Sequence, residues 1–206
     1  MAGPENFVAR GPRLTRDDVA RAALGILDEY GLPDLTMRRL AAALNVQASA
    51  LYWHFPNKQS LLAELAERIV DGRRADSPAG SDWVERVAAE AAGLRDAMLA
   101  YRDGAEVVSS TYVLRIGSSS ALERLVAAIG RGGFDEDTTR RAAAAMLHFI
   151  LGHVSHEQQR LQYDSLGVLA DGARPVALDE AGEQRAAFAF GIDLLTAGLR
   201  ARSIAG

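Results

Sequence analysis

Apolar residues recur every three or four positions along almost the entire 206-residue chain. Such a period places them on one face of an α-helix, and no stretch shows the apolar–polar alternation that predicts a half-buried strand. The 49% hydrophobic and 24% charged residues are typical of a globular protein, and a chain of this length buries roughly 70% of its unfolded surface. The sequence therefore predicts an all-α fold with a core of its own.

Capping signals divide the first 74 residues into four expected helices. Residue types that cap helix N-termini stand at three of the starts, Thr15, Thr36 and Asn57. Asp18, three residues after Thr15, is typical of a capping box. Gly31 and Asn45, which tolerate the left-handed conformation that ends helices, close the first two. We expect a long helix over residues 15–31, short ones over 36–45 and 47–54, and a fourth over 57–72.

A segment rich in Ser, Pro and Gly at residues 76–82 is the best candidate for a linker. The helical patterns beyond it cover residues 83–102, 120–129, 135–163 and 180–202, with a less regular piece at 105–116 and an expected loop at 164–179. The sequence thus predicts a flexible start (residues 1–13), a small helical head (14–74) and a larger helical body (75–206).

Composition excludes several classes of function. The chain has no cysteine, which excludes disulfides, thiolate metal sites and a cysteine nucleophile. Residues 1–13 contain no apolar signal-peptide core, and the longest apolar stretch, 142–152, has about half of the ~20 residues that a membrane span needs. We therefore expect a cytoplasmic protein without membrane contact.

Metal chemistry would depend on histidines and carboxylates. His148, His153, His156 and Glu157 lie close together in the sequence, but they form no HExxH motif and no other segment supplies a clear third ligand. The paired Glu-x-x-His motifs of helical di-iron proteins are also missing. We expect no metal, no cofactor and no catalytic residue, with a metal-dependent helical enzyme as the alternative.

The distribution of charge is more informative than the net charge of −4. Residues 1–74 hold ten Arg or Lys against nine Asp or Glu, whereas residues 75–206 hold thirteen against eighteen. From Leu35 to Ala63 there is no acidic residue, and Arg38, Arg39 and Lys58 are present. A surface without carboxylates is expected where a protein faces DNA phosphates. Two short helices behind a longer one are also typical of a helix-turn-helix, whose second short helix enters the major groove.

From Leu35 the chain reads LTMRRLAAALNVQASALYWHFPNKQSLL, which closely resembles the DNA-binding head of the TetR family of bacterial transcriptional regulators. The residues that carry the resemblance are Leu51, Tyr52, Trp53, His54, Phe55, Lys58, Leu61 and Leu62. The resemblance is closer to the tetracycline-repressor branch of the family. It is carried by Trp53 and by three segments of the body, YRDGAEV, HFILGHVSHEQQ and AFAFGIDLLTAGL. The resemblance covers nearly the whole chain and implies a homodimer that binds palindromic double-stranded operator DNA and a small-molecule effector.

The resemblance also implies roles for residues of the head. Arg38 can place its planar guanidinium on the edge of a guanine. Gln47, Ala48 and Ser49 begin the recognition helix, and Ala48 replaces a base-reading Gln of the tetracycline repressor, so a different operator is expected. The expected contacts to phosphates or groove edges are Thr36, Tyr52, Trp53, His54 and Lys58, with core positions as the alternative for the two aromatic residues.

Other residues of the head are expected to lie away from base edges. Leu51 and Phe55, four residues apart, should face the core. Arg39 is interpreted as a solvated neighbour of Arg38. Residues 1–13 are either an arm in the minor groove or a flexible tail.

In the body, one helical face carries Phe188, Ile192, Leu195 and Leu199. The resemblance assigns it, together with the helix at 135–163, to a four-helix dimer interface. Tetracycline repressors bind their drug as a magnesium chelate, and this chain departs from their pocket. Val108 stands at the metal-binding His, and Arg74, Glu90 and Leu94 replace other pocket residues. Thr111 and His148 keep recognisable pocket identities. We expect a repressor released by a ligand other than magnesium-tetracycline; an activator, or a regulator with a protein effector, stays open.

Overall fold

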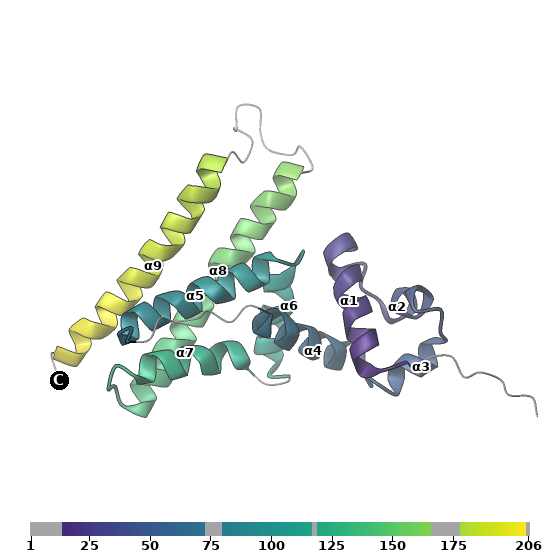
Figure 1. Ribbon diagram of the computed structural model, residues 1–206, viewed down its shortest axis with the longest axis horizontal. Helices are drawn as coiled ribbons and strands as arrows, with labels where there is room; N and C mark the ends of the chain where they lie inside the picture. The colour runs from purple at the N-terminus through teal and green to yellow at the C-terminus, as the bar shows by residue number, and fades with distance from the viewer. Residues whose placement is uncertain (1–13, 73–79, 117–118, 166–177, 205–206) are drawn as a thin grey trace, which may run out of the picture.

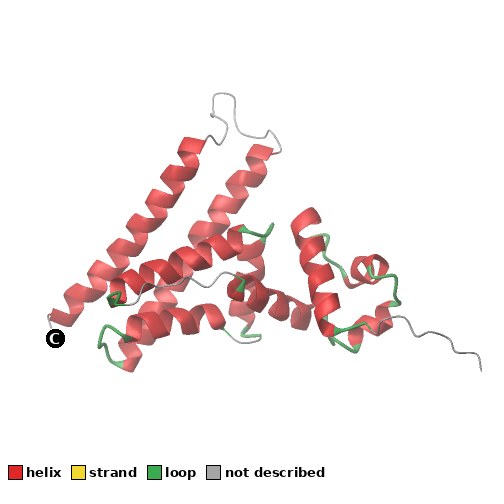
Figure 2. Ribbon diagram, in the orientation of Figure 1, coloured by secondary structure: helices red, strands yellow, loops and turns green. Residues whose placement is uncertain are grey.

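The computed structural model describes residues 14–72, 80–116, 119–165 and 178–204 (Figure 1). All regular secondary structure in these ranges is helical, so the predicted all-α fold is confirmed (Figure 2). The helices are α1 (Arg16–Tyr30), α2 (Met37–Ala43), α3 (Ala48–Tyr52), α4 (Lys58–Asp71), α5 (Trp83–Leu99), α6 (Gly104–Leu114), α7 (Ser120–Gly130), α8 (Glu136–Ser165) and α9 (Leu178–Ile204). None of these helices combines the length and apolar character needed to span a membrane.

The head helices start where the sequence predicts. The Thr15 hydroxyl accepts the Asp18 N–H, and the Asp18 carboxylate accepts the Thr15 N–H, which completes the predicted capping box. Asn57 caps α4 in the same way through Ser60. Asn45 adopts a φ of 53° in the turn between α2 and α3, a left-handed conformation that Asn tolerates better than most residues.

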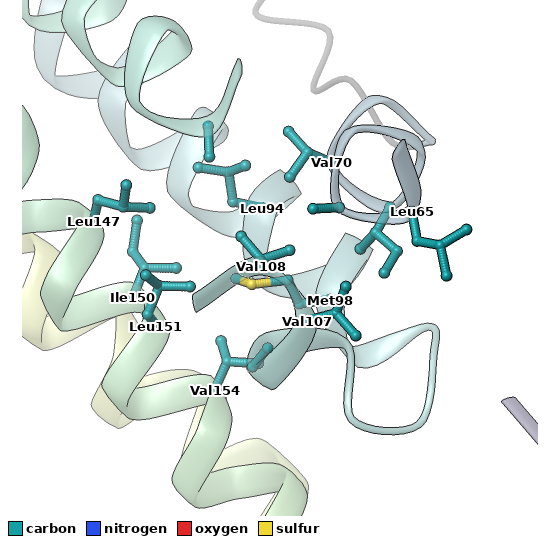
Figure 3. Close-up of a cluster of buried hydrophobic side chains, with 14 of the residues drawn as sticks. Leu65, Val70, Leu94, Met98, Val107, Val108, Leu147, Ile150, Leu151 and Val154 are labelled. Carbon is teal, nitrogen blue, oxygen red and sulfur yellow. The ribbon is translucent and has the colours of Figure 1, made fainter. Parts of the chain in front are cut away.

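Helix α4 joins the head to the body (Figure 1). It packs against α1 on the head side and against α5, α6 and α7 on the body side. Leu65 and Val70 of α4 lie in the same apolar cluster as Leu94 of α5 and Val107 and Val108 of α6 (Figure 3). Separating these helices would expose apolar surface at a cost of about 25 cal/mol per Å². The packing of the body therefore constrains the position of the head.

The body is built around the two long helices α8 and α9, which lie side by side. Helix α5 packs against both of them, and α7 packs against α5 and α8. At the start of α5, the Trp83 ring meets Phe134 edge to face at 5.2 Å. Between α5 and α6 the chain makes a tight turn, in which Asp103 has a φ of 55° and a Cβ at Gly104 would collide with the carbonyl of Met98. The glycine is therefore required by close backbone approach.

Two predicted segments differ in the structure. The expectation of a less regular piece at 105–116 is wrong, because α6 is a regular helix. Its β-branched residues have low helix propensity, but Val107, Val108 and Thr111 are buried, and tertiary packing outweighs propensity. The third helix is shorter than the predicted 47–54. The expected flexible start, most of the expected linker and most of the loop at 164–179 lie outside the described residues.

Candidate nucleic-acid interface and effector site

Helices α2 and α3 present the acid-free window to solvent. The exposed candidates for DNA contact are Thr36, Arg38, Gln47, Ser49, Tyr52 and Trp53, and the partly exposed ones are Ala48, His54 and Lys58. Tyr52 is 49% exposed and Trp53 is 89% exposed, so core positions for these two aromatic residues are excluded. A Trp exposed to this degree is uncommon, and its ring is available to another molecule.

The two neighbouring arginines of α2 have different surroundings. The Arg39 guanidinium pairs with Asp34 at 2.5 Å and lies 3.7 Å from the centre of the Tyr30 ring. Arg39 is therefore held against the end of α1, which corrects its interpretation as a merely solvated neighbour. Arg38 is exposed and makes no ion pair or side-chain hydrogen bond within the described part of the chain. Its guanidinium is free to act as a planar donor.

Thr36 and Lys58 are two further candidates that carry hydrogen-bond donors. The Thr36 hydroxyl accepts the Arg39 N–H at 3.1 Å as the cap of α2, and its own O–H can still donate. Lys58 is the first residue of α4, next to the Asn57 cap. Its ammonium adds to the positive end of the helix dipole, where anions bind favourably.

Behind this surface, α3 is anchored to the core and to α1. Leu51 and Phe55 are fully buried, which confirms the prediction that they face the core of the head. Arg16, the first residue of α1, donates to the carbonyl oxygen of His54 at 2.7 Å and to Glu64 of α4 at 2.9 and 3.0 Å. Its guanidinium carbon lies 4.1 Å from the centre of the Phe55 ring.

The ion pairs between α1 and α4 shift the pKa of their carboxylates. Hydrogen bonding by Arg68 lowers the pKa of Asp17 below its ordinary value. Burial alone raises the pKa of Glu64, but hydrogen bonds from Arg16 and Arg68 outweigh it and lower that pKa. These carboxylates are therefore charged at neutral pH and favour the packing of α1 on α4.

The residues predicted for the ligand pocket do not line an open cavity. Leu94 and Val108 are buried in the apolar cluster between α4, α5, α6 and α8 (Figure 3). Thr111 is also buried, and its hydroxyl donates to backbone carbonyls one turn earlier in α6. The cavity beside Val108 and Thr111 has a volume of about 20 Å³. This space admits a water molecule but no organic ligand.

The polar pocket candidates have separate partners. Glu90 is half-buried and pairs with Arg124 of α7 at 2.7 Å, and Arg124 also donates to the carbonyl of Val70. His148 is exposed on α8 and meets the Tyr112 ring at 5.6 Å. Arg74 lies outside the described residues. The carboxylate among the pocket candidates, Glu90, is thus already neutralised by a guanidinium.

The candidate metal residues serve other contacts. Glu157 is buried and binds Arg95 of α5 through both carboxylate oxygens, at 2.5 and 3.0 Å. His153 lies between aromatic rings, 5.2 Å from that of Phe188, and His156 is exposed. Within the ranges that the structure describes, no three His, Asp or Glu side chains gather as metal ligands do.

Helix α9 has an inner and an outer apolar face. Three of the four residues predicted for the dimer interface are buried within their own chain: Phe188, Ile192 and Leu199. Leu195 is partly exposed. The exposed face carries Phe190 (64% exposed) and Leu194 (58%) instead. Both faces of α9 are thus apolar, and the periodicity of the sequence does not distinguish them. The place of Phe188, Ile192, Leu195 and Leu199 in a dimer interface stays a prediction.

The turn between α5 and α6 contacts the end of α1. The Asp103 carboxylate accepts the backbone N–H of Leu32 at 2.8 Å and the side-chain amide of Gln162 at 2.5 Å. Gln158, buried on α8, binds backbone groups of the same turn. Gly31 has a φ of 82°, and a Cβ there would lie 2.7 Å from the Asp103 carboxylate. Head and body therefore share a polar contact besides the α4 packing.

Comparison with known proteins agrees with this architecture. The model of the tetR family of bacterial regulatory proteins matches residues 19–65, and that of the tetracyclin repressor-like C-terminal domain matches residues 76–203. The tetracycline repressor protein class A from transposon 1721 of Escherichia coli is 34% identical over 206 residues, with 93% of each chain covered. The chain belongs to the TetR family.

Solved structures of TetR-family proteins show the same fold. BioQ of Mycobacterium smegmatis is 38% identical, with a TM-score of 0.80 over 91% of this chain and 98% of that one. A structure of BioQ with its natural double-stranded DNA operator is 36% identical, with a TM-score of 0.74 over 90% and 98% of the two chains. This TetR-family protein is therefore a transcriptional regulator, and its relatives are regulators rather than enzymes.

Two features of this TetR-family chain were outside the sequence predictions. The contacts of Arg16 link residues 38 and 48 positions apart, so no local pattern indicates them. The only available signal was a cation in the first turn of a helix, where the helix dipole disfavours positive charge. The pairing of Glu90 with Arg124 likewise depends on the packing of α5 on α7.

Proposed function

We propose that this regulator is a homodimeric repressor that binds a palindromic operator and leaves it when a small molecule binds the body. The observation that carries the proposal is the exposed surface of α2 and α3, where Arg38 and Trp53 stand without any neighbouring carboxylate in the window from Leu35 to Ala63. The relative BioQ, solved with its DNA operator, supports the same use of this surface.

Residues of the head divide into base readers and phosphate contacts. Arg38 would place two N–H donors on the O6 and N7 atoms of a guanine, and Gln47, Ala48 and Ser49 would face base edges at the start of α3. The side chains expected to contact phosphates or groove edges are Thr36, Tyr52, Trp53, His54 and Lys58. In this division the head comprises residues 14–74 and the body residues 75–206.

The outer face of α8 and α9 supports a dimer, which is typical of the family. Phe190 and Leu194 are the large exposed apolar residues of α9, and a groove of about 530 Å³ between α8 and α9 is lined by Met146, Leu195 and Leu199 among others. A two-fold axis would place one chain's α9 on this surface of the other. The two recognition helices would then read half-sites about 34–36 Å apart.

The effector would bind in the body and is not magnesium-tetracycline. Val108 has no lone pair for a metal ion and is packed among apolar side chains. A ligand needs a pocket of roughly 300–1,000 Å³, so the cluster around Leu94 and Val108 must open. Such a pocket would contain Thr111 and the Glu90–Arg124 pair, and His148 is a further candidate for its lining. This lining suits a sizeable, partly polar molecule.

Opening the cluster would move α4 and the turn at Asp103, and both contact the head. Moving the population from almost all DNA-bound to almost all DNA-free requires a ligand that prefers the released conformation by roughly 5.5 kcal/mol.

We infer that the regulator acts in the cytoplasm and has no enzymatic activity, since Glu157 of the candidate metal residues is held by Arg95. Stoichiometric metal in the purified protein would contradict this inference.

The test is selection of bound DNA from a random duplex library, followed by sequencing. We expect enrichment of a palindrome whose half-sites are separated by about one helical turn, with a guanine at the position nearest Arg38. The selected sequence would locate the target genes. A library that yields no enriched sequence from a dimeric, folded protein would contradict the proposed function.

A further inference from the structure

The recognition helix is too short to hold its own position. Helix α3 has five residues, Gln47 gives it no side-chain cap, and its last carbonyl groups need partners from outside the helix. Leu51 and Phe55 fix it to the core from beneath. The exposed aromatic residues Tyr52 and Trp53 lie between these anchors, so their placement on DNA depends on what holds the end of the helix.

Arg16 occupies that position. It donates one N–H to the His54 carbonyl at 2.7 Å, directly after the two exposed aromatic residues, and two more to Glu64 of α4. Its guanidinium lies over the Phe55 ring at 4.1 Å, where cation–π attraction adds to the contact. One side chain therefore joins the start of α1, the end of α3 and the second turn of α4.

The other half of this contact is equally constrained. Glu64 also accepts a hydrogen bond from Arg68 at 2.9 Å, and Arg68 binds Asp17 at 2.5 Å. Glu64 is thus held by two guanidinium groups and cannot rotate away without leaving both. A planar donor fixed in this way loses little rotational freedom when it binds the His54 carbonyl.

We propose that Arg16 is a positioning residue for operator recognition: it sets the position of α3 on the head and contacts neither base nor phosphate. Three of its five N–H donors are engaged by Glu64 and the His54 carbonyl, which fixes the plane of the guanidinium against α3 and α4. A recognition helix displaced by about 1 Å loses base contacts while keeping the charges that attract DNA. The inference rests on the proposed function, because it assumes a specific operator.

The experiment compares Arg16→Met with Arg21→Met as the matched control. Arg21 also lies on α1, and its ion pairs are with Asp17 and Asp18 of the same helix. Affinity is measured by fluorescence anisotropy for the duplex selected with the unaltered protein and for a scrambled duplex of equal length, over a range of salt. Circular dichroism and thermal unfolding check that each variant is folded.

We expect Arg16→Met to weaken binding to the selected duplex about tenfold and to leave binding to the scrambled duplex and the salt slope unchanged. Glu64→Gln, a milder change at the other end of the contact, should lower specific affinity about threefold. Arg16→Lys should recover part of the loss, because an ammonium can donate to the His54 carbonyl. Arg21→Met should change specific affinity less than twofold.

Two results would overturn the proposal. Unchanged specific affinity of Arg16→Met shows that α3 needs no such anchor. A loss shared by both duplexes, with a salt slope reduced by about 0.9 for each arginine removed, identifies Arg16 as a phosphate contact instead. If Arg16→Met fails to fold, Glu64→Gln gives the same comparison. Failure of the proposed function is distinct, since no duplex would then be selected by the unaltered protein.

Discussion

The head and the body differ in how deeply their ion pairs are buried. In the head, ion pairs lie at the surface where α1 crosses α4, such as Arg68 with Asp17, while the recognition surface keeps no carboxylate. The body has exposed pairs too, such as Arg140 with Glu136 on α8, but it also has internal ones: Arg95 with Glu157 is almost fully buried, and Arg124 with Glu90 is largely so. The head thus keeps its ion pairs at the surface, whereas the body also places two ion pairs in its interior.

This difference separates two physical demands on the molecule. Affinity for DNA needs unpaired cations on a rigid framework. In the head, Arg16 and Arg39 are held against aromatic rings, and Arg38 is exposed. A switchable body needs alternative packings of similar free energy. Internal ion pairs restrict these packings, because separating the partners would leave an uncompensated buried charge.

The largest effect is expected from a charge on the outer face of the body. Leu194→Asp would place two carboxylates across the proposed two-fold interface, so the protein should be monomeric at micromolar concentration. The affinity for a palindrome would then fall about 10²- to 10⁴-fold, because the two heads would no longer be linked when they bind the two half-sites. Sedimentation equilibrium and anisotropy measure the two effects. Val113→Asp, at an exposed apolar residue of α6, is the control. A variant that remains dimeric would refute the proposed interface.

Breaking the internal Arg95–Glu157 pair should strongly destabilise the body. Glu157→Ala leaves the Arg95 guanidinium buried with only Asp96 nearby, and we expect a loss of about 3–5 kcal/mol in the free energy of unfolding. Urea denaturation at fixed protein concentration measures it. Glu123→Ala, an exposed carboxylate on α7, should change little. A loss below about 1 kcal/mol for Glu157→Ala would show that the pair relaxes readily.

In the head, neighbouring arginines should give different phenotypes. Arg38→Ala should cost about 1–3 kcal/mol of discrimination for each half-site and leave thermal stability unchanged. Arg39→Ala should instead lower stability by up to about 1 kcal/mol, because it removes the Asp34 pair and the Tyr30 contact. Anisotropy with matched and mutated half-sites, together with thermal unfolding, checks both. Equal effects of the two substitutions on specificity would show that Arg38 and Arg39 do not have separate roles in base reading and stability.

The smallest effect is the acid sensitivity of the head. The pKa values of Asp17 and Glu64 are below their ordinary values, so their stabilising effect is complete above the unfolded-state pKa values. It is lost as the pH falls through the lower folded-state values, below roughly pH 4. Thermal unfolding followed between pH 6 and pH 3 should show a smaller decrease in Glu64→Gln than in the unaltered protein. Identical pH profiles would contradict the role of Glu64.

Much of the head could be predicted because its signals are local. Thr15 with Asp18, and Asn57 with Ser60, are three residues apart and encode helix starts directly. The burial of Phe55 follows from its spacing with Leu51. The anchoring of Arg39 was missed because Asp34 lies just outside the acid-free window and the Tyr30 contact depends on the turn after α1.

The body was predicted less completely because its contacts are distant in sequence. Both faces of α9 are apolar, so periodicity alone does not tell whether Phe188 or Phe190 faces the chain's own core. Glu90 and Arg124 are 34 positions apart in the sequence, and no local pattern indicates their pairing. Resemblance placed Val108 in a ligand pocket, whereas the structure shows how completely its neighbours fill that space.

The two tryptophans give this molecule a built-in optical readout. Trp53 is 89% exposed on the recognition surface, whereas Trp83 is partly buried against Phe134 at the start of α5. Their emission spectra should differ, with Trp53 at longer wavelength and accessible to a soluble quencher such as iodide. Binding to a duplex would quench the emission of Trp53 or shield it from iodide. Repacking of the body would shift the emission of Trp83. A single unlabelled sample therefore reports occupancy of the head and conformation of the body in separate spectral components.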